Sequence, residues 1–364
     1  MEELKYELWL TKLELGNKKK NRLSDCLGNA KAVYEAGKDK LIATNMVEED
    51  DADKIVNSKN IYDLDIEYSK FKTFNQNLIT RPMEGFPDKL KIIKNAPYGL
   101  FYIGTLPRDY DKCVSIVGAR RCSEYGRSMA IEIAEELSRR GYIIVSGMAL
   151  GIDNSAHVGA LKAGGVSIAV LGCGVDICYP RNNINTYVEL QKKGAIISDF
   201  WPGTAPINNN FPSRNRIISA LSNQVIIIEA REKSGSLITA DFALDQGKDI
   251  YALPGRITDS LSSGCNRLIE QGAGIITSIP NFVNNLEDVR LNTLYTDEFD
   301  NPATTFAEKE DKVVYGSLDY YPKSIETIIN ETNFDLMRVL SSIMNLCELG
   351  YAKEAFVNQY VKIK

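Results

Sequence analysis

Short apolar runs alternate with amphipathic helical segments from Val114 to about Thr277, and this alternation constrains the fold most strongly. The run at 225–228 is continuous and rich in β-branched residues, as is typical of a strand buried on both faces, and 114–117 is a further expected strand. Further strands are expected at 142–146, 167–171, 196–198, 250–253 and, as an edge, 275–277. Strands and helices that alternate in this way predict an α/β protein with a doubly wound, mostly parallel sheet.

Length, net charge and the distribution of apolar residues restrict the domain number, the partners and the location of this protein. The chain has 364 residues, which is enough for two or three domains, and 25% of them are charged. Its formal net charge is -5, so any nucleic-acid site must be a local basic patch. No apolar run is long enough to span a membrane, and the first residues contain acids without a signal-peptide pattern. We therefore expect a cytoplasmic protein that does not contact a membrane.

The cysteines and the histidine argue against metal and hydrolase chemistry. Seven cysteines occur without a C-x-x-C pair, and His157 is the only histidine. This spacing does not match a zinc site, so we expect reduced thiols and no metal. A serine or cysteine hydrolase would need His157 as its base, which weakens that interpretation.

The stretch 211–240 holds the densest group of candidate ligand residues. Arg214 and Arg216 open an expected helix, the strand at 225–228 follows, and the turn at 233–236 reads Lys-Ser-Gly-Ser. A glycine-serine turn between a strand and a helix presents backbone N–H groups that suit a phosphate. An ordinary serine-capped turn is the alternative. Two arginines, a lysine and a second glycine-containing turn upstream favour phosphate.

Other glycine and arginine turns follow the remaining strands. In a doubly wound sheet the carboxyl ends of the strands share one rim, so the turns at 118–121, 147–153, 172–174 and 233–236 should converge there. Glycine permits close backbone approach to a ligand, and arginine offers a forked donor to phosphate. The chain lacks both G-x-G-x-x-G after its first strand and a P-loop motif.

Six phrases of this sequence resemble the bacterial DNA-processing protein A family, also called Smf. They are IVGARRCSEYG (116–126), SGMALGIDNSAH (146–157), AVLGCGVDICYP (169–180), FPSRNRIISALS (211–222), SGSLITA (234–240) and ALPG (252–255). The resemblance implies an extended Rossmann-like domain that binds single-stranded DNA, forms a homodimer and hands the strand to the RecA recombinase in natural transformation. It implies neither catalysis nor a cofactor. Asp199 stands where the family usually has glutamate, which keeps the charge.

A set of candidate DNA-binding residues follows from these turns and from the resemblance, whose motifs place the family's arginine on Arg120, its R-N-R on residues 214–216 and its serine-glycine-serine turn on residues 234–236. The set is Gly118, Arg120, Arg121, Gly147, Arg214, Asn215, Arg216, Lys233, Ser234, Gly235, Ser236 and Asn266. We expect Arg120, Arg214, Arg216 and Lys233 to line one positive groove, with Gly118 and residues 234–236 donating N–H groups. In the alternative, Arg214 or Arg216 pairs with an internal carboxylate such as Asp199 or Glu229 and shapes the loop.

Four regions are expected along the chain. They are a helical domain similar to SAM or helix-hairpin-helix modules at 1–65, the extended Rossmann-like domain at 66–280, a polar linker at 281–303 and a winged-helix-like domain at 304–364. The first has a single glycine, Gly16, in its turn, which favours a packing role. The last holds seven Lys/Arg against nine Asp/Glu, and its expected recognition helix carries only Arg338. A groove-reading helix needs more cations, so we expect a protein-contact or regulatory role.

Two other function classes remain open. One is a nucleotide-processing enzyme, because the SGSLITA turn is distantly similar to that of phosphoribohydrolases. Those enzymes carry a P-G-G-x-G-T turn followed by a catalytic glutamate, and residues 239–241, Thr-Ala-Asp, supply no glutamate at that place. The other is a nucleotide-sensing scaffold on the same sheet.

Overall fold

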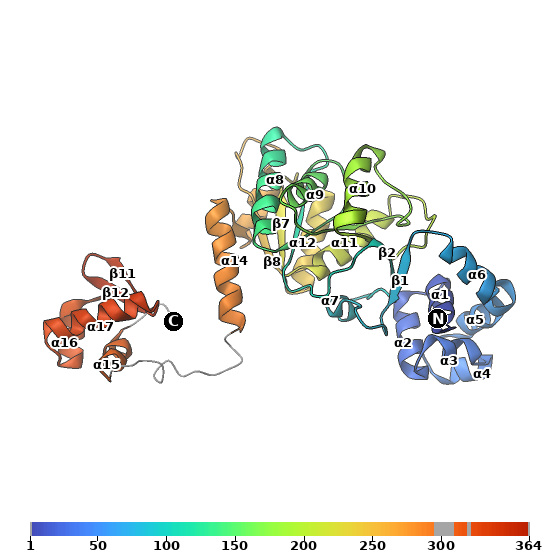
Figure 1. The fold of residues 1–364 in the computed structure, drawn as a ribbon, viewed down its shortest axis with the longest axis horizontal. Coiled ribbons are helices and arrows are strands. Elements are labelled where there is room, and N and C mark those ends of the chain that lie inside the picture. The colour runs from blue at the N-terminus through green and yellow to red at the C-terminus, as the bar shows by residue number, and fades with distance from the viewer. Residues whose placement is uncertain (1, 295–308, 319–321, 363–364) are drawn as a thin grey trace. The chain divides into compact units, whose positions relative to one another are not determined.

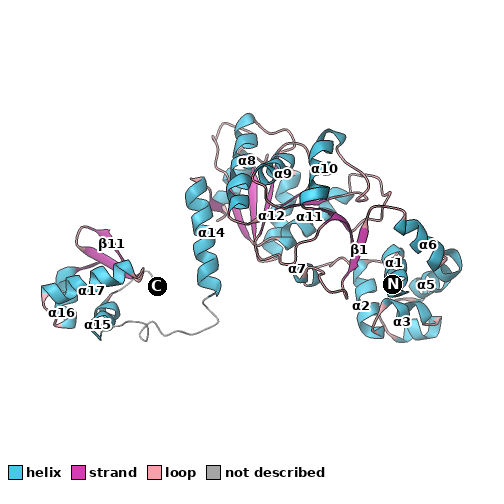
Figure 2. Cartoon of the chain, viewed as in Figure 1, coloured by secondary structure: helices cyan, strands magenta, loops and turns pink. Residues whose placement is uncertain are grey.

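The structure is a computed structural model, and it describes residues 2–294, 309–318 and 322–362. The chain divides into two compact units, Met1–Leu286 and Glu287–Lys364, which are treated separately below. The first unit contains helices α1 to α13 and one large sheet (Figures 1 and 2). The second contains the last residues of α14 (Ile279–Leu294), a small sheet and the helices α15 to α17.

Within the described residues, the first unit has one nine-stranded sheet in the order β1-β2-β6-β5-β4-β3-β7-β8-β9. Its strands are β1 (Asn77–Thr80), β2 (Gly99–Gly104), β3 (Cys113–Gly118), β4 (Ile143–Ser146), β5 (Ser167–Val170), β6 (Ala195–Ser198), β7 (Gln224–Ile228), β8 (Asp249–Ala252) and β9 (Gly274–Ile275). Only the β1–β2 and β2–β6 pairings are antiparallel. The predicted α/β class with a doubly wound, mostly parallel sheet is confirmed.

Helices cover both faces of this sheet. One face packs against α8 (Glu124–Arg139), α9 (Ile152–Lys162) and the start of α14 (Ile279–Leu294). The other packs against α7 (Asp88–Lys91), α11 (Asn210–Leu221), α12 (Gly235–Asp245) and α13 (Ser263–Glu270). Successive residues of one strand point to opposite faces of the sheet. Ile116 and Ile226 belong to the core on the side of α8 and α9, and Val117 and Ile227 belong to the core on the side of α11 and α12. Burial of both strand faces explains the continuous apolar runs in the sequence.

The N-terminal helices form a small core of their own. They are α1 (Glu2–Lys12), α2 (Asn17–Leu27), α3 (Ala30–Glu35), α4 (Lys38–Ala43), α5 (Glu49–Ile61) and α6 (Leu64–Lys72). Trp9, Leu23 and Ile55 lie in that core. The Tyr98 hydroxyl lies 2.6 Å from a Glu7 carboxylate oxygen, and Tyr98 packs into the helical core although it directly precedes β2. The helices therefore pack onto the sheet domain, and α6 extends past the expected boundary at residue 65.

The prediction of a polar linker at 281–303 is wrong for residues 281–294. Residues 279–294 form α14, and Phe282, Val283 and Leu286 are buried against the sheet layer. The spacing of these three apolar residues places them on one face of a helix. The asparagines and acids around them dominate the composition of the segment, and this polar composition is the reason that the sequence predicts a linker. The rest of the expected linker, 295–303, lies outside the described residues.

The second unit has the outline of a winged helix, as predicted. Its elements are α15 (Lys309–Ser317), β10 (Lys323–Ser324), α16 (Ile325–Thr332), α17 (Leu336–Glu348), β11 (Ala352–Phe356) and β12 (Gln359–Lys362), with sheet order β10-β12-β11. The Ser324 and Asp335 side chains cap α16 and α17. Arg338 on α17 lies 3.6 Å from carboxylate oxygens of both Glu310 and Asp335, so its charge is already partly offset.

His157 lies on α9, fully buried between the helix and β5, with Nδ1 2.7 Å from the Ser167 hydroxyl. Burial, reinforced by the positive charge of Arg214, lowers its pKa from 6.5 to about 3. The folded pKa lies below the unfolded one, so the stability contribution is present above pH 6.5 and is lost as pH falls from 6.5 towards 3. We expect this residue alone to lower the free energy of unfolding by about 2 kcal/mol between pH 7 and pH 5.

Urea unfolding of the natural protein and of His157→Gln at the two pH values measures this effect. The variant is expected to be less stable at pH 7 but to lose about 2 kcal/mol less on going to pH 5. Equal pH dependence in the two proteins would show that His157 takes up a proton in the folded state as readily as in water.

Candidate nucleic-acid interface

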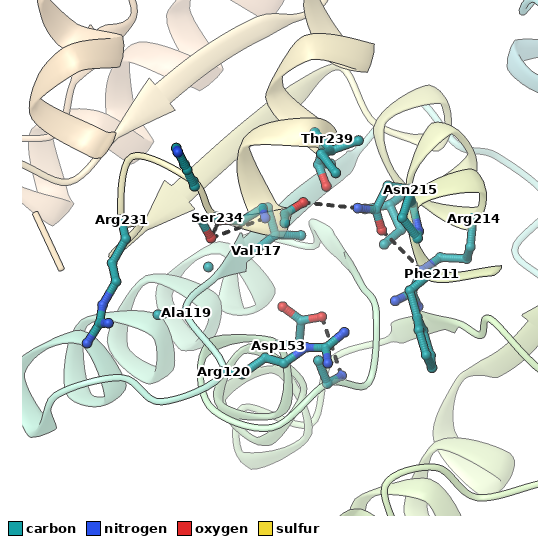
Figure 3. A pocket seen from close by; sticks show the side chains of 18 of the residues that line it. Val117, Ala119, Arg120, Asp153, Phe211, Arg214, Asn215, Arg231, Ser234 and Thr239 are labelled. Atoms are coloured by element: carbon teal, nitrogen blue, oxygen red, sulfur yellow. Dashed lines mark hydrogen bonds between the residues drawn. The ribbon is translucent and has the colours of Figure 1, made fainter. Parts of the chain in front are cut away.

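A cleft lies at the carboxyl ends of β3 and β7 (Figure 3). These two strands are neighbours at the centre of the sheet, where the chain order changes direction, and this switch point is where doubly wound sheets bind ligands. The turns after β3 and β7, the start of α11 and the start of α12 form its walls. Nine predicted site residues line it: Gly118, Arg120, Arg121, Arg214, Asn215, Lys233, Ser234, Gly235 and Ser236.

The cleft is strongly positive for a protein of net charge -5. Its lining includes five cations and one carboxylate, that of Asp153. Four of the cations, Arg120, Arg121, Arg231 and Lys233, are exposed, and none forms an ion pair with a carboxylate in the part of the chain that the structure describes. Unpaired cations gathered in a concave surface attract polyanions. Sequence reasoning missed Arg231, although it follows β7 by three residues.

Arg214, the fifth cation, differs from the other four. It is only 4% exposed, and its guanidinium donates to the carbonyl of Gly147 at 2.7 Å and to that of Val170. Burial lowers its pKa to about 10, opposed by the negative charge of Asp153. Arg214 lines the cleft as predicted, but its head group is buried and holds the carbonyls of Gly147, in the turn after β4, and of Val170, the last residue of β5. A phosphate contact by Arg214 stays a prediction.

Asp153 is the buried counter-charge of this arginine. Its Oδ2 accepts hydrogen bonds from the backbone N–H groups of Gly147 (3.1 Å) and Ala149 (3.4 Å). Burial raises the pKa of Asp153, opposed first by the charge of Arg214. A Cβ on Gly147 would lie 2.6 Å from Asp153 Oδ2 and 2.7 Å from the Arg214 guanidinium, so only glycine fits there. Gly147 lines a smaller hollow beside the cleft rather than the cleft itself.

The structure places Arg216 outside the cleft, which corrects the expected groove of four cations. Its guanidinium forms an ion pair with Asp199 at 2.6 Å and donates to the carbonyl of Asn95 at 3.2 Å. Both side chains of the pair are at most 10% exposed. The alternative in which Arg216 pairs with an internal carboxylate, here Asp199, is confirmed.

The glycine-serine turn caps α12 as the sequence indicates. The Ser234 side chain accepts from the N–H of Ser236, and the N–H of Ser234 donates to Arg231, so these two N–H groups already have acceptors inside the turn. Gly235 opens the helix and has no intrahelical acceptor for its N–H. Fewer backbone N–H groups of residues 234–236 are therefore available to a ligand in the cleft than the sequence predicts. Gly118 is also structural, since a Cβ there would lie 1.8 Å from the carbonyl oxygen of Ile228.

The two predicted asparagines separate in the fold. Asn215 lines the cleft and donates to the carbonyl of Gly235 at 3.3 Å, which ties α11 to the start of α12. Asn266 lies apart from the cleft lining and exchanges two hydrogen bonds with the backbone of Gly255, at 3.0 and 3.2 Å. Asn266 thus holds the turn after β8.

An aromatic pair beside the cations was not predicted. The rings of Phe211 and Tyr179 are stacked with centroids 5.6 Å apart, and the Arg120 guanidinium lies 5.3 Å from the Phe211 centroid. Phe211 is half-buried and lines the cleft, and Tyr179 is 41% exposed. Aromatic residues in a sequence usually indicate core, so nothing local marks these two as a surface platform.

The described residues contain no group of three or more His, Cys, Asp and Glu side chains arranged to hold a metal ion. None of the helices in the same residues has the length and apolar character that a membrane span requires.

The similarity of this chain to a known family is found in the sheet domain that contains the cleft. The sequence model of the family described as DNA recombination-mediator protein A matches residues 77–287, more than half of the chain. The chain belongs to this family. The match includes the whole large sheet and every residue of the cleft, and it excludes the N-terminal helices and the winged-helix unit.

Individual proteins are also similar to this chain in sequence and in structure. DNA processing protein DprA of Streptococcus pneumoniae is 42% identical over 193 residues, 53% of this chain and 68% of that protein. The Bacillus subtilis protein of the same name is 38% identical over 61% of this chain and 75% of its own length. The X-ray structure of the S. pneumoniae protein superposes with a TM-score of 0.67, 33% identity and coverage of 77% of this chain and 95% of that one.

A second solved structure is that of DNA processing protein A from Helicobacter pylori, with a TM-score of 0.53 and 35% identity over 59% of this chain and 97% of that one. The work on that protein describes its single-stranded DNA binding mode.

Proposed function

We propose that the cleft binds single-stranded DNA. The observation that carries this proposal is the combination of four exposed, unpaired cations with the Phe211–Tyr179 stack on one rim. Proteins that bind single strands use cations for the backbone and aromatic rings for the bases. The base faces are hidden inside a duplex, so the aromatic pair contributes only with an open strand. The described binding mode of the H. pylori relative supports the same ligand.

We also propose that the cleft binds its ligand without catalysing a reaction. Asp153 is the one carboxylate of its lining, and Asp153 is buried, with Oδ2 engaged by two backbone N–H groups beside Arg214. A general acid or base must reach the reacting atoms, and this carboxylate instead holds the loop. Chromatography for free base after incubation with nucleoside monophosphates tests for the phosphoribohydrolase alternative.

Two further proposals, on the oligomeric state and on the protein partner, rest on membership of the family. We propose that the chain acts as a homodimer, which lets two short clefts hold one strand with increased avidity. We further propose that it passes the strand to the RecA recombinase in natural transformation. Sedimentation at micromolar concentration tests the first proposal, and formation of RecA filaments on a strand already bound by this protein tests the second.

Binding to single-stranded and duplex oligonucleotides of equal length tests the proposed function. We expect tighter binding to the single strand, with log K falling against log salt by about 0.7 for each cation in contact with phosphate. Four contacts predict a slope of about -2.8. Equal affinity for duplex, or no affinity for either, would overturn the proposal.

A further inference from the structure

We propose that Glu229 is a positioning residue of the cleft, which holds the turn that carries Arg120 and Arg121 in the arrangement that binds phosphate. This role rests on the proposed function of the cleft. Glu229 directly follows β7 and is not itself part of the cleft lining. Its loss is expected to weaken the binding of a polyanion, although the loss removes a negative charge.

The first step is the set of contacts that Glu229 makes. The residue is 4% exposed, and its carboxylate accepts from the backbone N–H of Ser123 at 2.8 Å and from the Ser123 hydroxyl. Its own carbonyl accepts from the N–H of Ala119, also at 2.8 Å. Glu229 thus binds both ends of the turn 119–123, which joins β3 to α8. The two arginines of the turn lie between these ends.

The second step is the backbone of Glu229, whose φ is +53°. This left-handed conformation is unfavourable for a residue that has a Cβ, and residues held in it gather at functional sites. Glycine adopts the same conformation without strain, but glycine would lack the carboxylate that reaches Ser123. The carbonyl of the next residue, Ala230, accepts from the N–H of Gly264 at 2.7 Å, so the chain is also fixed on that side. The backbone strain at this position therefore accompanies a side chain with a definite partner.

The third step is the fit of the carboxylate at the start of α8. Ser123 is the N-cap of this helix, and its hydroxyl accepts from the N–H of Gly126 at 3.1 Å. A Cβ on Gly126 would overlap the Glu229 carboxylate, so the helix has a glycine where the acid approaches. A negative group at a helix N-terminus is favoured by the free N–H groups and by the helix dipole. The carboxylate therefore has one well-defined place, and the turn is fixed with it.

The effect of Glu229 on a bound strand has two contributions of opposite sign. Arg120 and Arg121 are two of the four exposed cations of the cleft, and a cation on a fixed turn loses less conformational freedom when it binds a phosphate. Coulomb repulsion between the carboxylate and the strand acts in the other direction. If positioning dominates, removal of the acid weakens binding. If repulsion dominates, the same removal strengthens binding.

Glu229→Ala in the full chain tests the proposal with an oligothymidylate of about 16 nucleotides, the upper end of the site sizes of small binding domains. We expect about tenfold weaker binding and a shallower salt slope, because the two arginines are no longer held in place. Glu232→Gln is the matched control. It removes the same charge from the exposed turn after β7, outside the cleft lining, and should not weaken binding.

A double-mutant cycle separates positioning from a general loss of structure. In the Arg120→Ala/Arg121→Ala background, Glu229→Ala should change the affinity by less than about twofold, because no guanidinium remains to be positioned. Circular dichroism verifies that each variant is folded at the temperature of the titration. Glu229→Gln keeps the shape of the side chain and replaces Glu229→Ala if that variant does not fold. Ser123→Ala removes the other partner and gives the same comparison if neither variant at 229 folds.

The outcomes separate the two proposals. If the variant binds the oligonucleotide as tightly as the natural protein does, or more tightly, the positioning role is refuted and the cleft is unaffected. If the affinity falls by the same factor with and without Arg120 and Arg121, the effect does not act through these cations and the positioning role is likewise refuted. If the natural protein does not bind the oligonucleotide, the proposed function itself fails.

Discussion

Arg214→Ala is expected to lower the free energy of unfolding by about 3–5 kcal/mol, the cost of removing one partner from a buried pair of opposite charges. Asp153 would remain buried without the nearby guanidinium, and the carbonyls of Gly147 and Val170 would each lose a donor. A loss of this size corresponds to a decrease of about 10 °C in Tm for a domain of this length. Because the loop at Gly147 borders the cleft, DNA binding should fall with it.

Thermal unfolding monitored by circular dichroism measures the change. Asp153→Asn combined with Arg214→Leu should recover part of the lost stability, because the double variant no longer buries an uncompensated charge. Arg120→Ala is the control, since Arg120 is exposed and should leave Tm unchanged. A Tm for Arg214→Ala within about 1 °C of the natural protein would show that Arg214 is not part of the structural core.

Replacing Arg120 and Lys233 together by alanine is expected to weaken single-stranded DNA binding about 100-fold without a change in Tm. Each contact between a charged side chain and a phosphate contributes about 1.5 kcal/mol, and two contacts account for two powers of ten. The salt slope should become shallower by about 1.4, and the loss should be the same for all base sequences because phosphates carry no sequence information. Fluorescence anisotropy at several salt concentrations measures both quantities.

Lys40→Ala combined with Lys54→Ala is the matched control for this variant. Both lysines are exposed and lie on the N-terminal helices α4 and α5, so the net charge changes equally without altering the cleft. An affinity and a salt slope like those of the control would show that the strand does not contact Arg120 and Lys233.

The sequence by itself determined the architecture and the site's location. Strands such as 225–228 are recognisable because a strand covered on both faces must be continuously apolar, and that requirement is local. The carboxyl ends of parallel strands share one rim, so the turns that contain Gly118, Arg120 and residues 233–236 were correctly brought together. The motif order also identified the family, which the match to residues 77–287 confirms.

Only the tertiary structure decided what each charged or aromatic residue does at that rim. Arg214 and Arg216 are two positions apart on one helix, yet one meets the carbonyls of Gly147 and Val170 and the other meets Asp199. The stack of Tyr179 on Phe211 likewise joins residues that are distant in the chain. An arginine has the same charge and shape whether it faces a phosphate, a carboxylate or a carbonyl. Its role depends on which distant segments the fold packs around it and on how much water they exclude.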